Sequence, residues 1–213
     1  MSDLTLLQIA QSVARDVGLA QPTAVVSATD DIDRGMVEMK QCLDFVGEEL
    51  ARRVDWSALR SEVTLTGTGA AFAHPLPASY LRMMAGNAVK LATSFAPVRG
   101  GLSAEEFLSL PAVVGTPRFY LIGGARGSKT INFWPHLANT FVATALVQTE
   151  NWVASATAYA SDSDIALVPS PLMVKGGIAR WRRQKGMDFA DYVAEYEAAL
   201  ANFATFDDGA RSP

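Results

Sequence analysis

Two kinds of hydrophobic periodicity divide this 213-residue chain, and their order limits the folds that it can adopt. Near both ends, apolar residues recur every three or four positions, which is the spacing that lines one face of an α-helix. Between about residues 60 and 155 the pattern alternates in steps of two and is broken by Gly and Pro, as is typical of strands and turns. This order predicts an α+β protein with a β-rich insertion between helical parts.

Two helices are predicted before the β-rich region. The first covers about residues 5–17 and ends at Gly18, a residue type suited to a helix C-cap. The second covers about residues 31–54, with polar N-cap candidates at 27–30. Its acidic start and the basic residues at its end both suit the helix dipole.

Two further helices are predicted after the β-rich region. One begins at Pro169 or Pro171, because proline is tolerated in the first turn of a helix, and it stops at Gly186. The last begins after Asp188 and carries a stripe of aromatic and aliphatic residues to about residue 203. That stripe is either core or, if it is broader than one face, a subunit interface, since aromatic residues are enriched at interfaces.

The middle of the chain predicts short strands joined by tight turns. The segments with strand character are 61–66, 80–84, 117–122, 130–134 and 141–149. A short helix is expected at 103–110, because Ser103 and Glu106 have the spacing of a capping box. The Gly-rich run at 123–130 is expected to be a hairpin turn rather than a phosphate-binding loop, because a strand follows it where that loop requires a helix.

These elements predict a four-helix bundle with an inserted β-rich subdomain. The expected boundaries are an N-terminal helical pair at 1–58, the β-rich insertion at 59–158 and a C-terminal helical pair at 159–204 that completes the bundle. Residues 205–213 lack periodicity and are expected to form a mobile tail.

Composition excludes several classes of protein. The formal net charge of −4 gives no bulk attraction for phosphate, so sequence-independent DNA binding is not expected to be the main function. A single cysteine, Cys42, cannot form an internal disulfide. The first residues lack the basic segment of a signal peptide, and no apolar run of about 18 residues occurs, so we expect a protein of a cytoplasm-like compartment without a membrane span.

Residues that could take part in catalysis or metal binding are few and scattered along the sequence. His74 and His136 each adjoin a proline and have no partner at metal-ligand spacing, so loop or surface histidines are expected. Asp162 and Asp164 resemble part of a calcium loop, but turn or helix-entry chemistry explains them better. Cys42 lies beside apolar residues and is expected to belong to the core. We therefore expect no catalytic residue, no metal site and no cofactor.

One charge cluster has two readings. It consists of Arg180, Arg182, Arg183 and Lys185. The simpler interpretation is a basic helix C-terminus that suits the dipole and is exposed on one face. The functional interpretation is an anchor for an acidic partner surface or for DNA that passes nearby.

Several short motifs follow one another in a recognisable order along the chain. In the last third of the chain they are the segments 161–169, 177–182, 185–190 and 196–200. Towards the N-terminus they are the helix that ends at Trp56, the strand at 62–65 and the segments 76–82 and 151–153. In this order the motifs resemble those of the head-to-tail adaptor (connector) proteins of tailed bacteriophages. The chain departs from that pattern in the apolar, Gly-rich stretches at 98–101 and 111–116, and in Phe189, where the family often has Tyr.

This resemblance implies a structural virion protein without enzymatic activity. Such adaptors form a ring, typically of twelve copies, in the virion neck beneath the portal. The ring extends the DNA channel and provides a docking platform for a tail or stopper protein, and DNA passes through it without sequence-specific binding. The isolated chain is expected to be a monomer or small oligomer in the host cytoplasm before assembly, because a template raises the effective concentration of weak contacts.

The basic cluster and the C-terminal segment, which the resemblance places at the portal, together give the expected contact residues, and two rival functions remain. The portal or partner contact is expected at Arg180, Arg182, Arg183, Lys185, Phe203, Phe206 and Arg211. One rival is another neck or tail-completion (stopper) protein, although these are usually dominated by β-structure. The other is a small cell-wall or nucleic-acid hydrolase, which would require a pair of carboxylates in a cleft. A DNA-binding regulator is disfavoured by the acidic charge.

Overall fold

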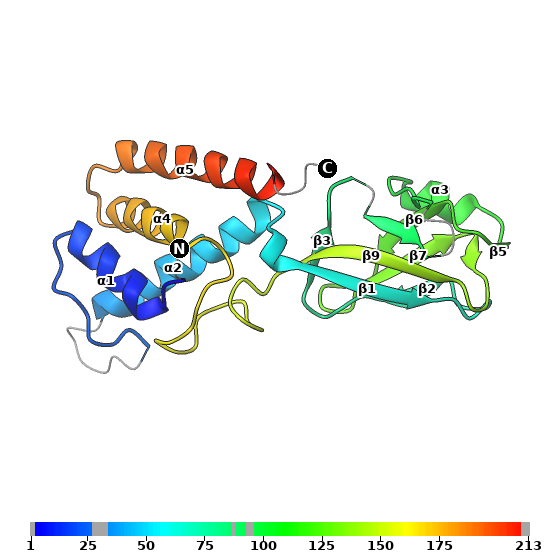
Figure 1. Ribbon diagram of the computed structural model, residues 1–213, viewed down its shortest axis with the longest axis horizontal. Coiled ribbons are helices and arrows are strands. Elements are labelled where there is room, and N and C mark those ends of the chain that lie inside the picture. The colour runs from blue at the N-terminus through cyan, green and yellow to red at the C-terminus, as the bar shows by residue number, and fades with distance from the viewer. Residues whose placement is uncertain (1–2, 27–33, 87, 93–95, 210–213) are drawn as a thin grey trace. The chain divides into compact units, whose positions relative to one another are not determined.

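The computed structural model describes residues 3–26, 34–86, 88–92 and 96–209 and divides the chain into two compact units (Figure 1). The helical unit contains residues 1–59 and 150–213, and the β unit contains residues 60–149. The N-cap candidates at 27–30, the first turn of the helix expected from residue 31, and Arg211 lie outside the described residues.

The helices predicted at both ends of the chain are confirmed. They are α1 (Leu6–Asp16), α2 (Arg34–Arg53), α4 (Ser170–Gln184) and α5 (Ala190–Gly209), and a 3-10 turn, η2 (Ser57–Leu59), follows α2. A capping box between Thr5 and Gln8 starts α1, and Gly18 follows it with a φ of +76°. The helix α5 continues through residues 205–209, which had been expected to belong to a tail, while 210–213 lie outside the described residues.

The predicted four-helix bundle is wrong, although the α+β class is correct. Instead of two helical pairs around a shared core, α4 packs against α1, α2 and α5 and is the centre of the helical unit. A fifth helix, α3 (Ala104–Ser109), lies in the β unit.

Two glycines of α4 explain this arrangement. A Cβ atom at Gly176 would lie 2.7 Å from Val46 of α2 and 3.0 Å from Tyr196 of α5. A Cβ atom at Gly177 would lie 2.8 Å from Leu43 of α2 and 3.1 Å from Val13 of α1. Because α4 has no side chains at these positions, three helices approach its backbone directly.

The β unit consists of short strands in three sheets. The strands are β1 (Arg60–Thr66), β2 (Ala73–Pro75), β3 (Tyr80–Met83), β4 (Val89–Leu91), β5 (Val114–Gly115), β6 (Phe119–Gly123), β7 (Thr130–Trp134), β8 (His136–Leu137) and β9 (Val142–Thr149). In the largest sheet β9 is central, with β1 on one side and β3 and β4 on the other. A second sheet has the order β2-β7-β6, and β5 pairs with β8.

A single apolar core holds the β unit together. Ala143, Ala145 and Val147 alternate along β9 and are fully buried, and Ile131 and Phe133 of β7 are buried with them. All residues of this core cluster lie between 60 and 149, so the β unit has its own hydrophobic core. The predicted β6–β7 hairpin and the Ser103–Glu106 capping box of α3 are both confirmed.

Candidate partner-binding site

The residues predicted to contact a partner lie in two regions of the helical unit. The basic cluster occupies the C-terminal end of α4, where Lys185 is the C-cap residue. Phe203 and Phe206 lie in the last turns of α5. The structure therefore does not gather the predicted residues into one surface patch, and the two regions are considered separately.

The four cations of the basic cluster each lie against an aromatic ring of the same unit. The distances to the ring centroids are 3.7 Å for Arg180 and Phe45, 4.3 Å for Arg182 and Tyr192, 5.8 Å for Arg183 and Phe189, and 4.8 Å for Lys185 and Trp181. Lys185 also forms an ion pair with Glu38, and its hydrogen bond lowers the pKa of that carboxyl group. These contacts stabilise α2, α4 and α5 against one another, so the cluster has a structural role in its own fold.

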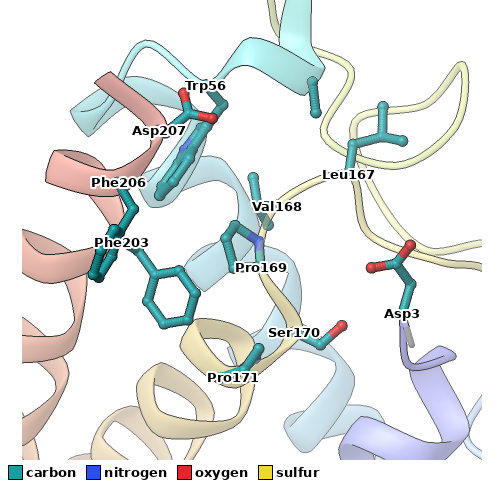
Figure 2. Close-up of a pocket in the computed structure, with 11 residues that line it drawn as sticks. Asp3, Trp56, Leu167, Val168, Pro169, Ser170, Pro171, Phe203, Phe206 and Asp207 are labelled. Carbon is teal, nitrogen blue, oxygen red and sulfur yellow. The ribbon is translucent and has the colours of Figure 1, made fainter. Parts of the chain in front are cut away.

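Phe203 and Phe206 line a pocket of about 410 Å³ in the helical unit. Figure 2 shows Phe203, Phe206 and Asp207 of α5 facing Trp56, with the chain at 167–171 forming the other wall. Phe206 is 77% exposed, which is unusual for so large an apolar side chain at the end of a helix. An exposed aromatic side chain thus forms part of the pocket lining.

Hydrogen bonds fix the walls of this pocket. Asp207 accepts hydrogen bonds from the backbone N–H of Ser57 at 2.8 Å and from its hydroxyl at 2.6 Å, which joins the end of α5 to η2. The indole N–H of Trp56 donates to the carbonyl oxygen of Leu50 at 2.8 Å, so one ring edge is anchored. Pro169 starts α4, and the hydroxyl of Ser170 accepts a hydrogen bond from the N–H of Leu4 at 3.0 Å.

The lining of the pocket is mostly apolar and is suited to binding an apolar group. Most of its residues are apolar, and its carboxylates are those of Asp3 and Asp207, the second of which is occupied by Ser57. An apolar pocket with a few polar groups typically receives an apolar side chain of a ligand or partner. Elsewhere in the described part of the chain, no three His, Cys, Asp or Glu residues gather in a way that could hold a metal ion.

The acidic motif at 161–164 serves the fold of the helical unit. Asp162 accepts hydrogen bonds from the N–H groups of Val25 and Val26 at 3.0 and 2.9 Å. Asp164 accepts from the N–H groups of Ala160 and Ser161 at 2.7 and 2.8 Å. The prediction of turn chemistry is confirmed for Asp164, whereas the side chain of Asp162 binds the backbone of a segment that is distant in the sequence.

Cys42 is buried, as predicted. Its thiol lies 3.0 Å from Oε1 of Gln184, and burial raises its pKa.

Sequence reasoning found the two phenylalanines but not the walls opposite them. Leu167, Val168 and Trp56 come from irregular segments, in which no periodicity assigns a side chain to a face. Pro169 and Pro171 predicted the start of α4, and thus the position of this wall in the sequence, but not which side chains face the pocket.

A comparison with protein families and one with curated proteins bear on these observations. No helix among the described residues combines the length and apolar composition needed to cross a membrane. The curated proteins include no match to this sequence. The sequence model of the family described as SU10 adaptor protein matches residues 4–213.

Proposed function

This chain belongs to the SU10 adaptor protein family, and we propose that it is a structural protein of the phage neck that forms a ring beneath the portal. The observation that carries the proposal is the extent of the match, because residues 4–213 include both the helical and the β unit. A shared module alone would match only one of them.

In this proposal the protein acts by assembly and not by chemistry. Copies of the chain, twelve in the expected ring, extend the DNA channel of the portal and give the tail or stopper protein a surface on which to dock. DNA passes through without sequence-specific contacts. The contact between copies joins different patches, because a closed ring requires heterologous interfaces.

We propose that the apolar end of α5 makes the contact with the portal or with another neck protein. Exposed aromatic side chains beside a pocket are typical of binding hot spots. Phe206 supplies such a side chain, and Phe203 forms part of the pocket beneath it. The basic cluster stays a prediction as a contact site; it consists of Arg180, Arg182, Arg183 and Lys185. Because these cations already stack on aromatic rings of the helical unit, we favour the end of α5 as the contact surface.

The first experiment is electron microscopy of the purified chain alone and with its cognate portal protein. Rings that appear or thicken only in the presence of the portal support the proposal. If the chain does not bind the portal but binds a neck that has already assembled, or closes the channel of that neck, the stopper function would be favoured. An absence of any neck interaction would require activity assays on cell-wall and nucleic-acid substrates.

Substitution of Phe206 tests the proposed contact surface. Phe206→Ala is expected to weaken portal binding by about tenfold or more, since removal of a hot-spot aromatic costs about 2 kcal/mol. Leu108→Ala in the β unit is the matched control, because Leu108 is 83% exposed, close to the 77% of Phe206. Both variants should fold as the unaltered protein does. If both variants bound the portal equally well, the proposal that the end of α5 contacts the portal would be wrong.

A further inference from the structure

The two units of the chain carry opposite net charges. The β unit contains seven cations, Arg60, Arg82, Lys90, Arg99, Arg118, Arg126 and Lys129, against three anions, Glu62, Glu105 and Glu106, and its net charge is +4. The remaining eleven cations and nineteen anions belong to the helical unit and give it −8. The net charge of −4 for the whole chain conceals this separation.

The cations of the helical unit that the structure describes have partners within that unit. Ion pairs there include Lys40 with Asp44 at 2.8 Å, Arg53 with Glu197 at 2.6 Å and Lys175 with Glu195 at 2.9 Å. The cations at the end of α4 lie on aromatic rings. Carboxylates therefore remain in excess on the helical unit.

Several cations of the β unit lack such partners. Arg60, Lys90, Arg99 and Arg118 are exposed, and no carboxylate lies within ion-pair distance of them among the residues that the structure describes. All ten charged residues of the β unit belong to that described part, so its carboxylates are fully accounted for. These cations are available to a partner.

Three cations of the β unit share one face of its largest sheet. Arg60 of β1 and Arg82 of β3 are both register partners of Gln148 on the central strand β9. Lys90 of β4 is the partner of Thr144, which lies on the same face because side chains alternate along a strand. Ala143, Ala145 and Val147 point to the opposite face, into the core. Glu62 of β1, the partner of Leu146, lies on the face of the cations, so this face carries three cations and one anion. Gln148 is fully buried, and the exposed cations of the face are Arg60 and Lys90.

We propose that the cations of the β unit bind the acidic helical unit of a second copy of this chain. The contact rests on the ring proposed above and gives it a direction. Two β units repel each other, as do two helical units, whereas a β unit and a helical unit attract. Charge segregation of this kind disfavours contacts between like units and favours the contact between unlike units that each head-to-tail interface of a ring can make.

DNA is the other polyanion that could meet a basic face, and the charges favour the second copy. A chain with net charge −4 is repelled by DNA at long range, so the β unit would have to bind phosphate against the field of the helical unit. For a second copy, the same acidic unit is the attractive partner.

Light scattering of the full chain without the portal tests the proposal. As NaCl falls from about 500 to about 50 mM, screening weakens, and the second virial coefficient of the unaltered chain should turn from positive to negative. A protein with an even charge of −4 would show the opposite trend, with stronger repulsion at low salt. The sign of this change is therefore diagnostic, and it does not depend on whether the chain binds a portal.

Two variants with the same net charge locate the attraction. Arg60→Gln, Lys90→Gln, Arg99→Gln and Arg118→Gln together bring the β unit from +4 to zero and the chain from −4 to −8. Arg15→Gln, Arg34→Gln, Arg52→Gln and Lys175→Gln bring the chain to the same −8 but leave the β unit at +4. The first variant should lose the attraction at low salt, and the second should keep it.

Three outcomes would overturn the proposal. They are stronger repulsion of the unaltered chain at low salt, an equal loss of attraction in both variants, or tight salt-dependent binding of a DNA duplex of about 20 base pairs by the unaltered chain without self-association. Ring formation on the portal could still occur in each case, so failure here is distinguishable from failure of the proposed function.

Discussion

At the scale of single residues, glycines inside helices set the packing of the helical unit. A glycine within a helix costs about 0.5–1 kcal/mol relative to alanine, so three of them in packed helices require an explanation. Gly176 and Gly177 bring three helices onto α4, and Gly47 admits the indole ring of Trp152. Trp152 is fully buried, which makes that contact part of the core.

Gly47→Ala is expected to destabilise the protein by about 1–3 kcal/mol, the usual cost of overpacking a core. The added Cβ would lie 2.4 Å from the Trp152 ring, so the indole would have to move. Thermal unfolding monitored by tryptophan fluorescence measures the loss.

Gly35→Ala on the same helix is the control for Gly47→Ala. The nearest atom to a Cβ at Gly35 is on Trp181 at 3.9 Å, an ordinary contact, so this variant should be neutral or slightly more stable. Similar destabilisation by both variants would show that the effect of Gly47→Ala does not come from the contact with Trp152, because helix propensity alone predicts a gain in stability for both.

These glycines also show why the sequence predicted the helices but not their arrangement. Periodicity assigns each helix a buried face, and it located α1, α2, α4 and α5 correctly. A glycine contributes nothing to such a pattern, so the surfaces of α4 around Gly176 and Gly177 were not recognised as contact surfaces. A four-helix bundle is the simplest way to bury four apolar stripes against one another. That prediction did not include the contacts that neighbouring helices make with the backbone of α4 at its glycines.

At the scale of elements, a forked ion pair fastens α5 to α2. The guanidinium of Arg53 donates to both carboxylate oxygens of Glu197 at 2.7 and 2.6 Å and also to Glu49 at 2.9 Å. The hydrogen bond from Arg53 lowers the pKa of Glu197 below its usual value of 4.5. A planar guanidinium suits this geometry better than a lysine ammonium would.

A double-mutant cycle of Arg53→Ala and Glu197→Ala should give a coupling energy of about 0.5–1 kcal/mol, because both side chains remain partly exposed to water. Denaturant unfolding of the four proteins measures it. Since the pKa of Glu197 is lowered in the folded state, the coupling should persist above pH 4.5 and disappear as the pH falls below that value.

The neighbouring pair Arg52–Glu48 provides the comparison for that cycle. Its closest distance is 3.5 Å and it lies within one helix, so its coupling energy should be about 0.3–0.5 kcal/mol, at or below the low end of the range expected for Arg53–Glu197. A coupling energy near zero for Arg53–Glu197 would show that α5 is not held by this contact.

The length of a strand determined whether it could be predicted from the sequence. The alternating pattern of β9, eight residues long, was recognised, as were β1, β3, β6 and β7. The strands β2, β4, β5 and β8 have only two or three residues, too few to show alternation, and were missed. The pocket beside Phe206 was missed for a related reason, since its far wall is irregular chain.

At the scale of the whole molecule, the β unit has the properties of an independent domain. Its core cluster uses only its own residues, and its charge is opposite to that of the rest of the chain. A fragment of residues 60–149 is therefore expected to fold alone.

Dispersed amide signals in an NMR spectrum and a cooperative thermal transition of this fragment would check that expectation. At pH 7 the fragment, with net charge +4, should bind a cation exchanger, whereas the full chain, with −4, should bind an anion exchanger. A fragment with the narrow amide dispersion of an unfolded chain would show that the β unit depends on the helical unit for its fold.

The strands by which the chain enters and leaves the β unit are paired with each other. Arg60 at the start of β1 is the register partner of Gln148 near the end of β9, so the two junctions lie roughly 5 Å apart. An insertion whose two ends lie side by side resembles a cassette, because it can be exchanged as a unit. If another insertion or a tight turn replaced it, the distance between the two ends of the helical unit that must be joined would stay the same. Evolution can therefore lengthen, shorten or replace this cassette in a neck protein without redesigning the helices that carry it.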